Sequence, residues 1–151
     1  FVYGTLMRGE RAHARIARHR PARIVEATAR GRLVSLGHCP GLLGGDADGQ
    51  VRGELVEVDD PGALVEELDP FEDFVGYGRQ GSVYRRVVTE VTDAAGRRVL
   101  AWTYRYVAGL DGTAPIASGD WRRRERAAQR GTAGAAPSAA SSAASHSRRR
   151  R

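Results

Sequence analysis

The order of its strand-like and helix-like segments constrains the fold of this 151-residue chain more than any other feature. Residues 83–91 and 99–107 are rich in β-branched and aromatic side chains, and a short turn ending in Gly96 joins them, which predicts a β-hairpin. Residues 51–58 alternate apolar and polar side chains, as a further strand would. Helical segments do not alternate with these strands, so we expect an α+β fold with a mixed or antiparallel sheet.

Four other segments complete the expected architecture. Residues 10–20 place apolar side chains at helical spacing. A second helix is expected to begin at residues 59–61, where two aspartates and a proline suit the first turn of a helix. Residues 24–36 form either one bent strand or two strands that meet at Gly31. Residues 39–48 are rich in glycine and polar side chains, so we expect a loop there.

The composition changes sharply near residue 127. Residues 1–121 hold 15 Arg and 17 acidic residues, a net charge of −2, whereas residues 122–151 hold 9 Arg and one Glu, a net charge of +8. The last stretch is mainly Ala, Ser, Gly and Arg, which cannot bury enough apolar surface to offset the entropy of ordering it. We therefore predict one folded domain over residues 1–126 and a disordered tail over residues 127–151. Nucleic acid is not an expected partner, because such a tail attracts it only unspecifically.

The rest of the composition points to a reducing compartment. Cys39 is the single cysteine, so no internal disulfide can form. No apolar stretch approaches the roughly 20 residues that span a bilayer, so we expect no membrane partner. We expect a cytoplasmic protein, and the sequence gives no oligomeric state.

A glycine turn near the start of the chain is the first candidate site. Tyr3-Gly4-Thr5-Leu6 follows a strand-like segment, and a strand that runs into Gly-Thr exposes successive backbone N–H groups. Such groups can form a concave anion site, and glycine lets a ligand approach closely. An ordinary strand-to-turn junction has the same sequence pattern, so the turn alone does not decide between the two interpretations.

Glu72 is the candidate acid/base residue. It stands between Phe71 and Phe74 at the expected end of the second helix. Apolar rings solvate a carboxylate poorly, which raises its pKa toward the range that a general base needs. The alternative is that Glu72 and the acidic residues around it form a solvated helix end.

Tyrosines of the predicted hairpin form the third pattern. Tyr84, Tyr104 and Tyr106 can offer hydroxyl groups in a cleft, although aromatic strands serve more often as core and in cross-strand pairs. No metal site is expected, because His13 and His19 are six residues apart and lie on different helix faces. A nucleophilic Cys39 paired with a histidine stays open, but a cysteine in a glycine-rich loop is better explained as incidental.

In their order along the chain these patterns resemble the gamma-glutamylcyclotransferase-like family, also described as avirulence-induced-gene-like. The matching pieces cover residues 1–121 and are FVYGTLMRGE, GELVEV, LVEELDPFEDF, YRR, AWTYRY and SGDW. The resemblance implies a compact fold in which strands close into a small barrel-like sheet flanked by helices. It also implies an enzyme that needs no cofactor and releases 5-oxoproline from small gamma-glutamyl amines.

The resemblance assigns roles to particular residues. It implies that Glu72 is the catalytic acid/base in the family's L-D-x-x-E pattern. Asp73 follows it where the family often has glycine, and this second carboxylate raises one of the two pKa values further. The loops 37–49 and 76–81 are expected on the leaving-group side. The implied substrate-binding residues are Tyr3, Gly4, Thr5, Leu6 and Tyr84.

In this chemistry the substrate supplies its own nucleophile. Its α-amine attacks the γ-carbonyl to close a five-membered ring, so no Ser or Cys nucleophile is needed. Two other functions stay open at this stage. One is a non-catalytic protein of the same fold that binds a small metabolite, and the other is an Arg-tailed interaction protein whose folded part is only a scaffold.

Overall fold

The computed structural model describes residues 1–44 and 49–124, so the predicted tail over residues 127–151 and the exact domain end at residue 126 lie outside the described part. In chain order the elements are α1 (Ala14–Ala17), β1 (Arg23–Arg30), β2 (Arg32–Ser35), β3 (Pro40–Leu43), β4 (Gln50–Glu57), α2 (Pro61–Phe71), β5 (Tyr84–Asp93), β6 (Arg98–Tyr106), β7 (Ala114–Pro115) and the 3₁₀ helix η1 (Trp121–Arg123).

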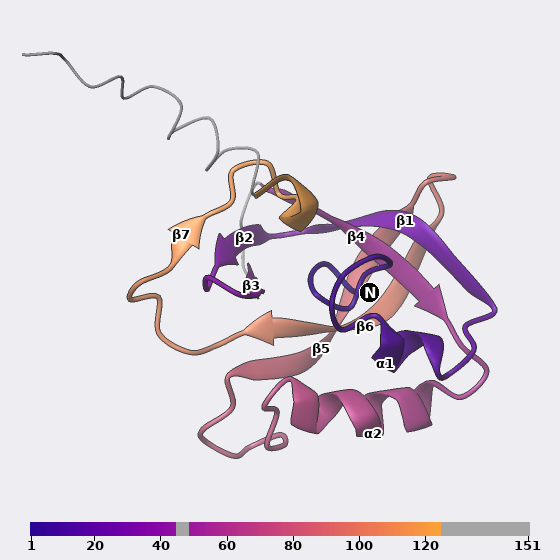
Figure 1. The fold of residues 1–151 in the computed structure, drawn as a ribbon, viewed down its shortest axis with the longest axis horizontal. Coiled ribbons are helices and arrows are strands. Elements are labelled where there is room, and N and C mark those ends of the chain that lie inside the picture. The colour runs from indigo at the N-terminus through magenta and orange to yellow at the C-terminus, as the bar shows by residue number, and fades with distance from the viewer. Residues whose placement is uncertain (45–48, 125–151) are drawn as a thin grey trace, which may run out of the picture.

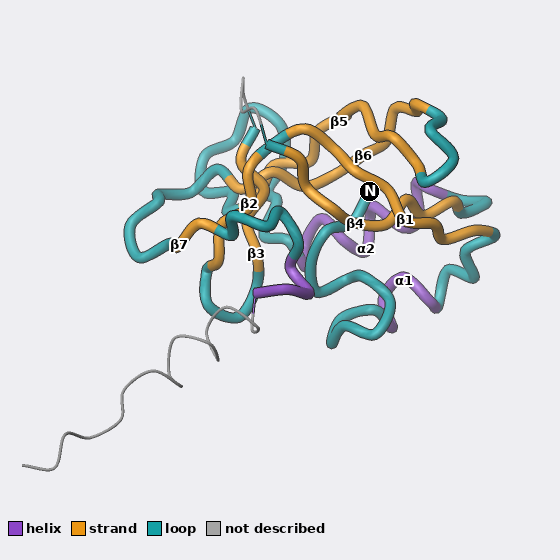
Figure 2. The backbone as a smooth tube through the Cα atoms, turned by 90° about the horizontal axis from the view of Figure 1, so that it is seen from above, coloured by secondary structure: helices purple, strands orange, loops and turns teal. Residues whose placement is uncertain are grey.

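The strands form two antiparallel sheets, which confirms the predicted α+β fold. The larger sheet has the order β4-β1-β5-β6, and the smaller has the order β3-β2-β7. Helices α1 and α2 lie next to each other along one side of the larger sheet, while β7 lies at the opposite end of the molecule (Figure 1). Seen from above, β2, β3 and β7 gather beside the larger sheet (Figure 2).

The segment at the start of the chain bridges the two edges of the larger sheet. Val2 pairs with Glu54 on the edge strand β4. The hydroxyl of Tyr3 donates to the carbonyl of Tyr104 on the other edge strand, β6, over 2.6 Å. These contacts connect the two edge strands of the larger sheet through the start of the chain and bring the predicted glycine turn next to β6.

Two expected elements differ from the prediction, and one open alternative is decided. The helix predicted over residues 10–20 is regular only in α1, because many N–H groups around it bind the carbonyl three residues back and form successive turns. Residues 24–36 form two strands, and Gly31 between them has a φ of +149° that favours glycine.

The loop predicted over residues 39–48 was wrong for its first part, which contains β3. Strand β3 pairs with β2 and buries Leu42. Its composition hid it, because Pro40 and Gly41 are unusual in strands. Gly41 is nevertheless required there, since a Cβ at this position would lie 2.8 Å from the Cβ of Tyr106. Residues 45–48 are outside the described part of the chain.

A buried carboxylate ties the start of the chain to β4. Glu54 is 2% exposed, and its carboxylate accepts hydrogen bonds from the backbone N–H of Arg8 at 2.8 Å and from its Nε at 3.0 Å. Arg122 in η1 donates to the same carboxylate over 3.0 Å. Burial alone raises the pKa of Glu54, but these donors hold the net pKa below its ordinary value. The ionised Glu54 carboxylate on β4 therefore joins two other segments, the residues that directly follow the glycine turn and the helix η1.

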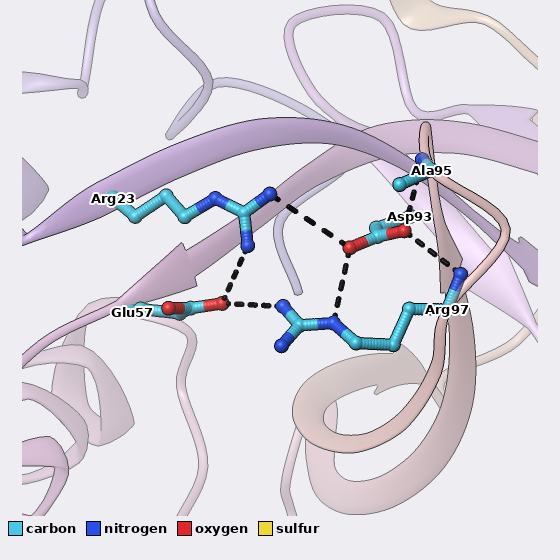
Figure 3. Close-up of polar contacts among 5 residues, drawn as sticks. All are labelled: Arg23, Glu57, Asp93, Ala95 and Arg97. Atoms are coloured by element: carbon cyan, nitrogen blue, oxygen red, sulfur yellow. Dashed lines mark hydrogen bonds and ion pairs between the residues drawn. The ribbon is translucent and has the colours of Figure 1, made fainter.

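A second charged cluster fixes the turn between β5 and β6 (Figure 3). The Asp93 carboxylate accepts from the backbone N–H groups of Ala95 and Arg97 at 3.0 and 2.9 Å, and these bonds lower its pKa. Arg97 also donates to Glu57, which pairs with Arg23 as well. The β5–β6 register runs from this turn to the Tyr84–Tyr106 pair at the other end. The cluster thus fixes the register that places Tyr84 and Tyr104.

Candidate active site

The predicted site residues gather around one cavity of about 470 Å³. Its wall is built from the glycine turn, the turn between β2 and β3, the C-terminal end of α2 and the adjoining ends of β5 and β6. The structure brings all six predicted residues to this wall: Tyr3, Gly4, Thr5, Leu6, Glu72 and Tyr84. Their chemical roles remain predictions, which the local geometry makes more specific.

The end of helix α2 places Glu72 at the cavity. The helix begins as predicted, with the Asp60 side chain accepting from the backbone N–H of Ala63 at 3.0 Å and Pro61 in the first turn. At the other end Glu72 caps the helix, and its backbone N–H donates to the carbonyl of Leu68 over 2.9 Å. Asp73 then takes a φ of +49°, so the chain turns away directly after Glu72.

The environment of Glu72 changes its acidity in the predicted direction. Burial raises the pKa of Glu72 from 4.5 to about 7, and the nearby Asp73 carboxylate adds to the increase. Phe74 is buried in the core, and Phe71 is half-buried on the same cavity wall as Glu72. A carboxyl with this pKa is partly ionised at neutral pH, so it can both accept and return a proton.

The glycine turn offers hydrogen-bond donors at the cavity wall. Its carbonyls are engaged: Gly4 accepts from Met7 at 3.0 Å, Thr5 accepts from Ala12 at 2.9 Å, and the Leu6 carbonyl lies 3.1 Å from a ring nitrogen of His13. Over residues 1–44 and 49–124, no oxygen accepts a hydrogen bond from the backbone N–H groups of Gly4, Thr5 or Leu6. Three successive donors without a partner form the kind of turn that binds an anion.

We expected a ligand to approach Gly4 closely, but in the structure Pro40 of the protein itself does so. A Cβ at Gly4 would lie 2.4 Å from Cγ of Pro40, the first residue of β3. Any side chain at position 4 would therefore push β3 away from the turn. The glycine is required for packing the cavity wall, whether or not a ligand also approaches it.

The tyrosine hydroxyls bind backbone carbonyls of neighbouring strands. Tyr84 donates to the carbonyl of Pro40 over 2.8 Å, and its oxygen lies 3.6 Å from Sγ of Cys39. Tyr3 donates to Tyr104 and accepts from the backbone N–H of Leu42 at 3.3 Å. Burial raises the pKa of both phenols, so both stay neutral. In the structure these side chains shape and hold the wall, and substrate binding by Tyr84 remains a prediction.

Asp69 connects the end of α2 to the hairpin, a link that the sequence did not suggest. Its carboxylate accepts from the Tyr104 hydroxyl at 2.6 Å and from Arg86 at 3.0 and 3.1 Å. Burial, followed by the Asp69 hydrogen bond, raises the pKa of Tyr104. The spacing of Asp69 three residues before Glu72 is the only local signal for this link. These hydrogen bonds from Arg86 and Tyr104 to Asp69 hold the last turn of α2, at the end of which Glu72 lies.

The wall also contains residues that the sequence did not select. Arg11, His38 and Cys39 line the cavity together with Leu36, so part of the loop beginning at residue 37 lies at the cavity, and its place on the leaving-group side stays a prediction. The other expected loop, residues 76–81, is not on the described lining. Within the described ranges no group of three or more His, Cys, Asp or Glu residues could hold a metal ion. No helix in this part of the chain has the length and apolar character required to cross a membrane.

Sequence comparison identifies the family. The profile described as "Gamma-glutamyl cyclotransferase, AIG2-like" matches residues 1–123, so the chain belongs to this family. It is 34% identical over 95 residues to the gamma-glutamylcyclotransferase family protein YtfP of Escherichia coli K12, covering 63% of this chain and 71% of YtfP. It is 33% identical over 108 residues to the gamma-L-glutamyl-butirosin B gamma-glutamyl cyclotransferase of Niallia circulans, covering 70% of this chain and 65% of that enzyme.

Solved structures share the fold. YkqA from Bacillus subtilis superposes with a TM-score of 0.65 at 26% identity, over 86% of this chain and 41% of YkqA. The chain therefore spans less than half of YkqA. PH0828 from Pyrococcus horikoshii superposes with a TM-score of 0.58, also at 26% identity, over 86% of this chain and 93% of PH0828.

Proposed function

We propose that this protein is a gamma-glutamyl cyclotransferase that converts a small gamma-glutamyl amine or peptide into 5-oxoproline and the free amine. One observation carries the proposal: Glu72, with a pKa of about 7, lines the same cavity as the unpartnered backbone N–H groups of Gly4, Thr5 and Leu6. The family supports a reaction of this type, and the name of the Niallia circulans relative states it for that protein. We also expect the reaction to take place in the cytoplasm, where Cys39 stays reduced.

The proposed reaction needs only one proton carrier. Glu72 takes a proton from the α-ammonium of the substrate, and the freed amine attacks the γ-carbonyl, forming a C–N bond and a tetrahedral intermediate. The intermediate collapses by breaking the C–N bond to the leaving amine, and Glu72 returns the proton to that nitrogen. The Glu72 carboxylate then takes the second proton from the ring nitrogen, which leaves neutral 5-oxoproline, and passes it to the departing amine, which leaves as an ammonium. Holding both groups of one molecule in position removes most of the entropic barrier.

The N–H groups of the glycine turn have one of two roles in this scheme. They hold either the α-carboxylate of the substrate or the oxyanion of the intermediate, and both are anions that such donors stabilise. The cavity volume of about 470 Å³ suits a small-molecule substrate. A protein that only bound a metabolite would gain nothing from a carboxyl whose pKa is held near neutrality, so catalysis explains Glu72 better.

Product analysis tests the proposal. The purified protein should release 5-oxoproline from members of a panel of gamma-glutamyl amines and amino acids. Two matched compounds should not react: an N-acetyl-gamma-glutamyl amine, whose nitrogen cannot attack, and a β-aspartyl amine, which would have to close a four-membered ring. Absence of 5-oxoproline from every gamma-glutamyl compound would contradict the proposal.

The pH dependence should report the neighbour of Glu72. The acid limb of kcat/KM should lie near pH 7, because Glu72 must be ionised to accept a proton. Asp73→Asn removes a like charge, which lowers the Glu72 pKa and should move this limb to lower pH. Asp59→Asn, at the exposed start of α2, is the matched control and should leave the limb in place. A limb that does not move in Asp73→Asn would show that Asp73 does not tune the base.

A further inference from the structure

Arg11 differs from the arginines near it in the sequence. Arg8 pairs with Glu54, and Arg15 and Arg18 both pair with Glu67. Within the described residues no carboxylate pairs with the Arg11 guanidinium, whose contact is the neutral carbonyl oxygen of His38 at 3.4 Å. Arg11 also lines the candidate active-site cavity, which Arg15 and Arg18 do not. It is therefore a cation at the cavity with donors available for a ligand.

The backbone holds Arg11 close to the glycine turn. The N–H of the next residue, Ala12, donates to the carbonyl of Thr5 over 2.9 Å. On its other side the guanidinium reaches the turn between β2 and β3, where His38 and Cys39 also line the cavity. Arg11 thus spans the two loops on one side of the cavity, and its side chain lines the cavity while staying exposed to solvent.

Charge is unevenly distributed around the cavity. The acidic groups on its wall are Glu72 and Asp73, both at the end of α2, whereas Arg11 and His38 belong to the loops. In the proposed reaction Glu72 and the N–H groups of the glycine turn serve the glutamyl half of the substrate. Arg11, at the exposed loops, is then the cation available to bind the other half of the substrate, the leaving amine.

We propose that Arg11 binds a carboxylate on the leaving amine, so that gamma-glutamyl amino acids are preferred over gamma-glutamyl derivatives of neutral or cationic amines. This inference rests on the proposed cyclotransferase function and specifies its substrate class. A guanidinium matches a carboxylate with two parallel hydrogen bonds, and this geometry discriminates against an amide of the same shape. We expect a preference of about tenfold in kcat/KM, because the site is open to solvent and screening weakens the pair.

The test compares gamma-glutamyl-alanine with gamma-glutamyl-alaninamide, which differ only in the carboxylate. The unmodified protein should prefer gamma-glutamyl-alanine, mainly through KM, and added salt should reduce the preference. Arg11→Gln should remove most of the preference by impairing gamma-glutamyl-alanine far more than the amide. Arg18→Gln, which changes an exposed arginine away from the cavity, should keep it.

Three outcomes separate the possibilities. Equal kcat/KM for the two compounds in the unmodified protein would overturn the role of Arg11 while leaving the cyclotransferase proposal intact. An equal loss for both compounds in Arg11→Gln would also overturn it, because Arg11 would then serve the glutamyl half. If neither compound yields 5-oxoproline, the full panel of gamma-glutamyl compounds decides the proposed function, and calorimetric binding of the two compounds to the unmodified and Arg11→Gln proteins decides whether Arg11 recognises the carboxylate.

Discussion

Glu72→Gln should lower kcat for 5-oxoproline release by about 10²–10⁴-fold, the usual contribution of a positioned general acid/base. Glutamine keeps the shape of the side chain but can neither take the proton from the substrate amine nor deliver it to the leaving nitrogen. The measurement is a steady-state assay of both variants over a range of pH. Glu66→Gln is the matched control, because Glu66 is an exposed member of the same acidic helix end and should be dispensable. Turnover of Glu72→Gln within a factor of two of the unmodified protein would remove Glu72 from the mechanism.

The same substitution should leave the protein folded and more stable at alkaline pH. The pKa of Glu72 is raised from 4.5 to about 7 in the fold, so ionising this carboxyl favours the unfolded chain. The stability of the unmodified protein should fall as pH rises from about 4.5 to 7, by up to about 3 kcal/mol. Glu72→Gln cannot ionise at this position and so does not lose this stability. In urea unfolding, its free energy of unfolding should therefore exceed that of the unmodified protein by more at pH 8 than at pH 5. An advantage that does not depend on pH would contradict the raised pKa of Glu72 in the folded protein.

Glu54→Gln should destabilise the protein by about 2–4 kcal/mol, because it removes a buried charge that Arg8 and Arg122 require. The measurement is urea unfolding at pH 7. Glu57→Gln is the control on the same strand, since Glu57 is 43% exposed and its pairs should contribute at most about 1 kcal/mol.

The decrease in the free energy of unfolding caused by Glu54→Gln should also depend on pH. The fold holds the pKa of Glu54 below its ordinary value, so its contribution is complete above that ordinary value and disappears as pH falls through the folded pKa. The difference between Glu54→Gln and the unmodified protein should therefore shrink in acid. Equal decreases in the free energy of unfolding for Glu54→Gln and Glu57→Gln would show that the buried carboxylate contributes no more stability than an exposed one.

Local sequence signals predicted the parts of the fold that local interactions decide. The Asp60 cap and Pro61 define the start of α2, and the hairpin of β5 and β6 follows from its strand composition and its turn. The direction of the Glu72 pKa shift could be predicted in part because Asp73, the next residue along the chain, adds to the effect of burial. In each case the partners lie within a few residues of one another.

The parts that could not be predicted depend on contacts between distant segments. Strand β3 exists because it pairs with β2 and packs on Tyr106, not because its own residues favour a strand. In the sequence Glu54 is one polar residue of an alternating strand. Its burial is possible only because Arg8 and Arg122, which are distant in the sequence, donate hydrogen bonds to its carboxylate. Arg11 is one arginine among many in the sequence, and only the fold shows that it lines the cavity and has no carboxylate partner among residues 1–44 and 49–124.

The most direct test of the account is to follow the products in water labelled with heavy oxygen. Intramolecular attack by the α-amine makes 5-oxoproline without using water, so the 5-oxoproline should carry no label, and it should form in equal amount with the free amine. This unlabelled product should disappear in Glu72→Gln. Labelled glutamate in place of 5-oxoproline would mean that water, not the substrate amine, attacks the γ-carbonyl, and would contradict the proposed cyclotransferase.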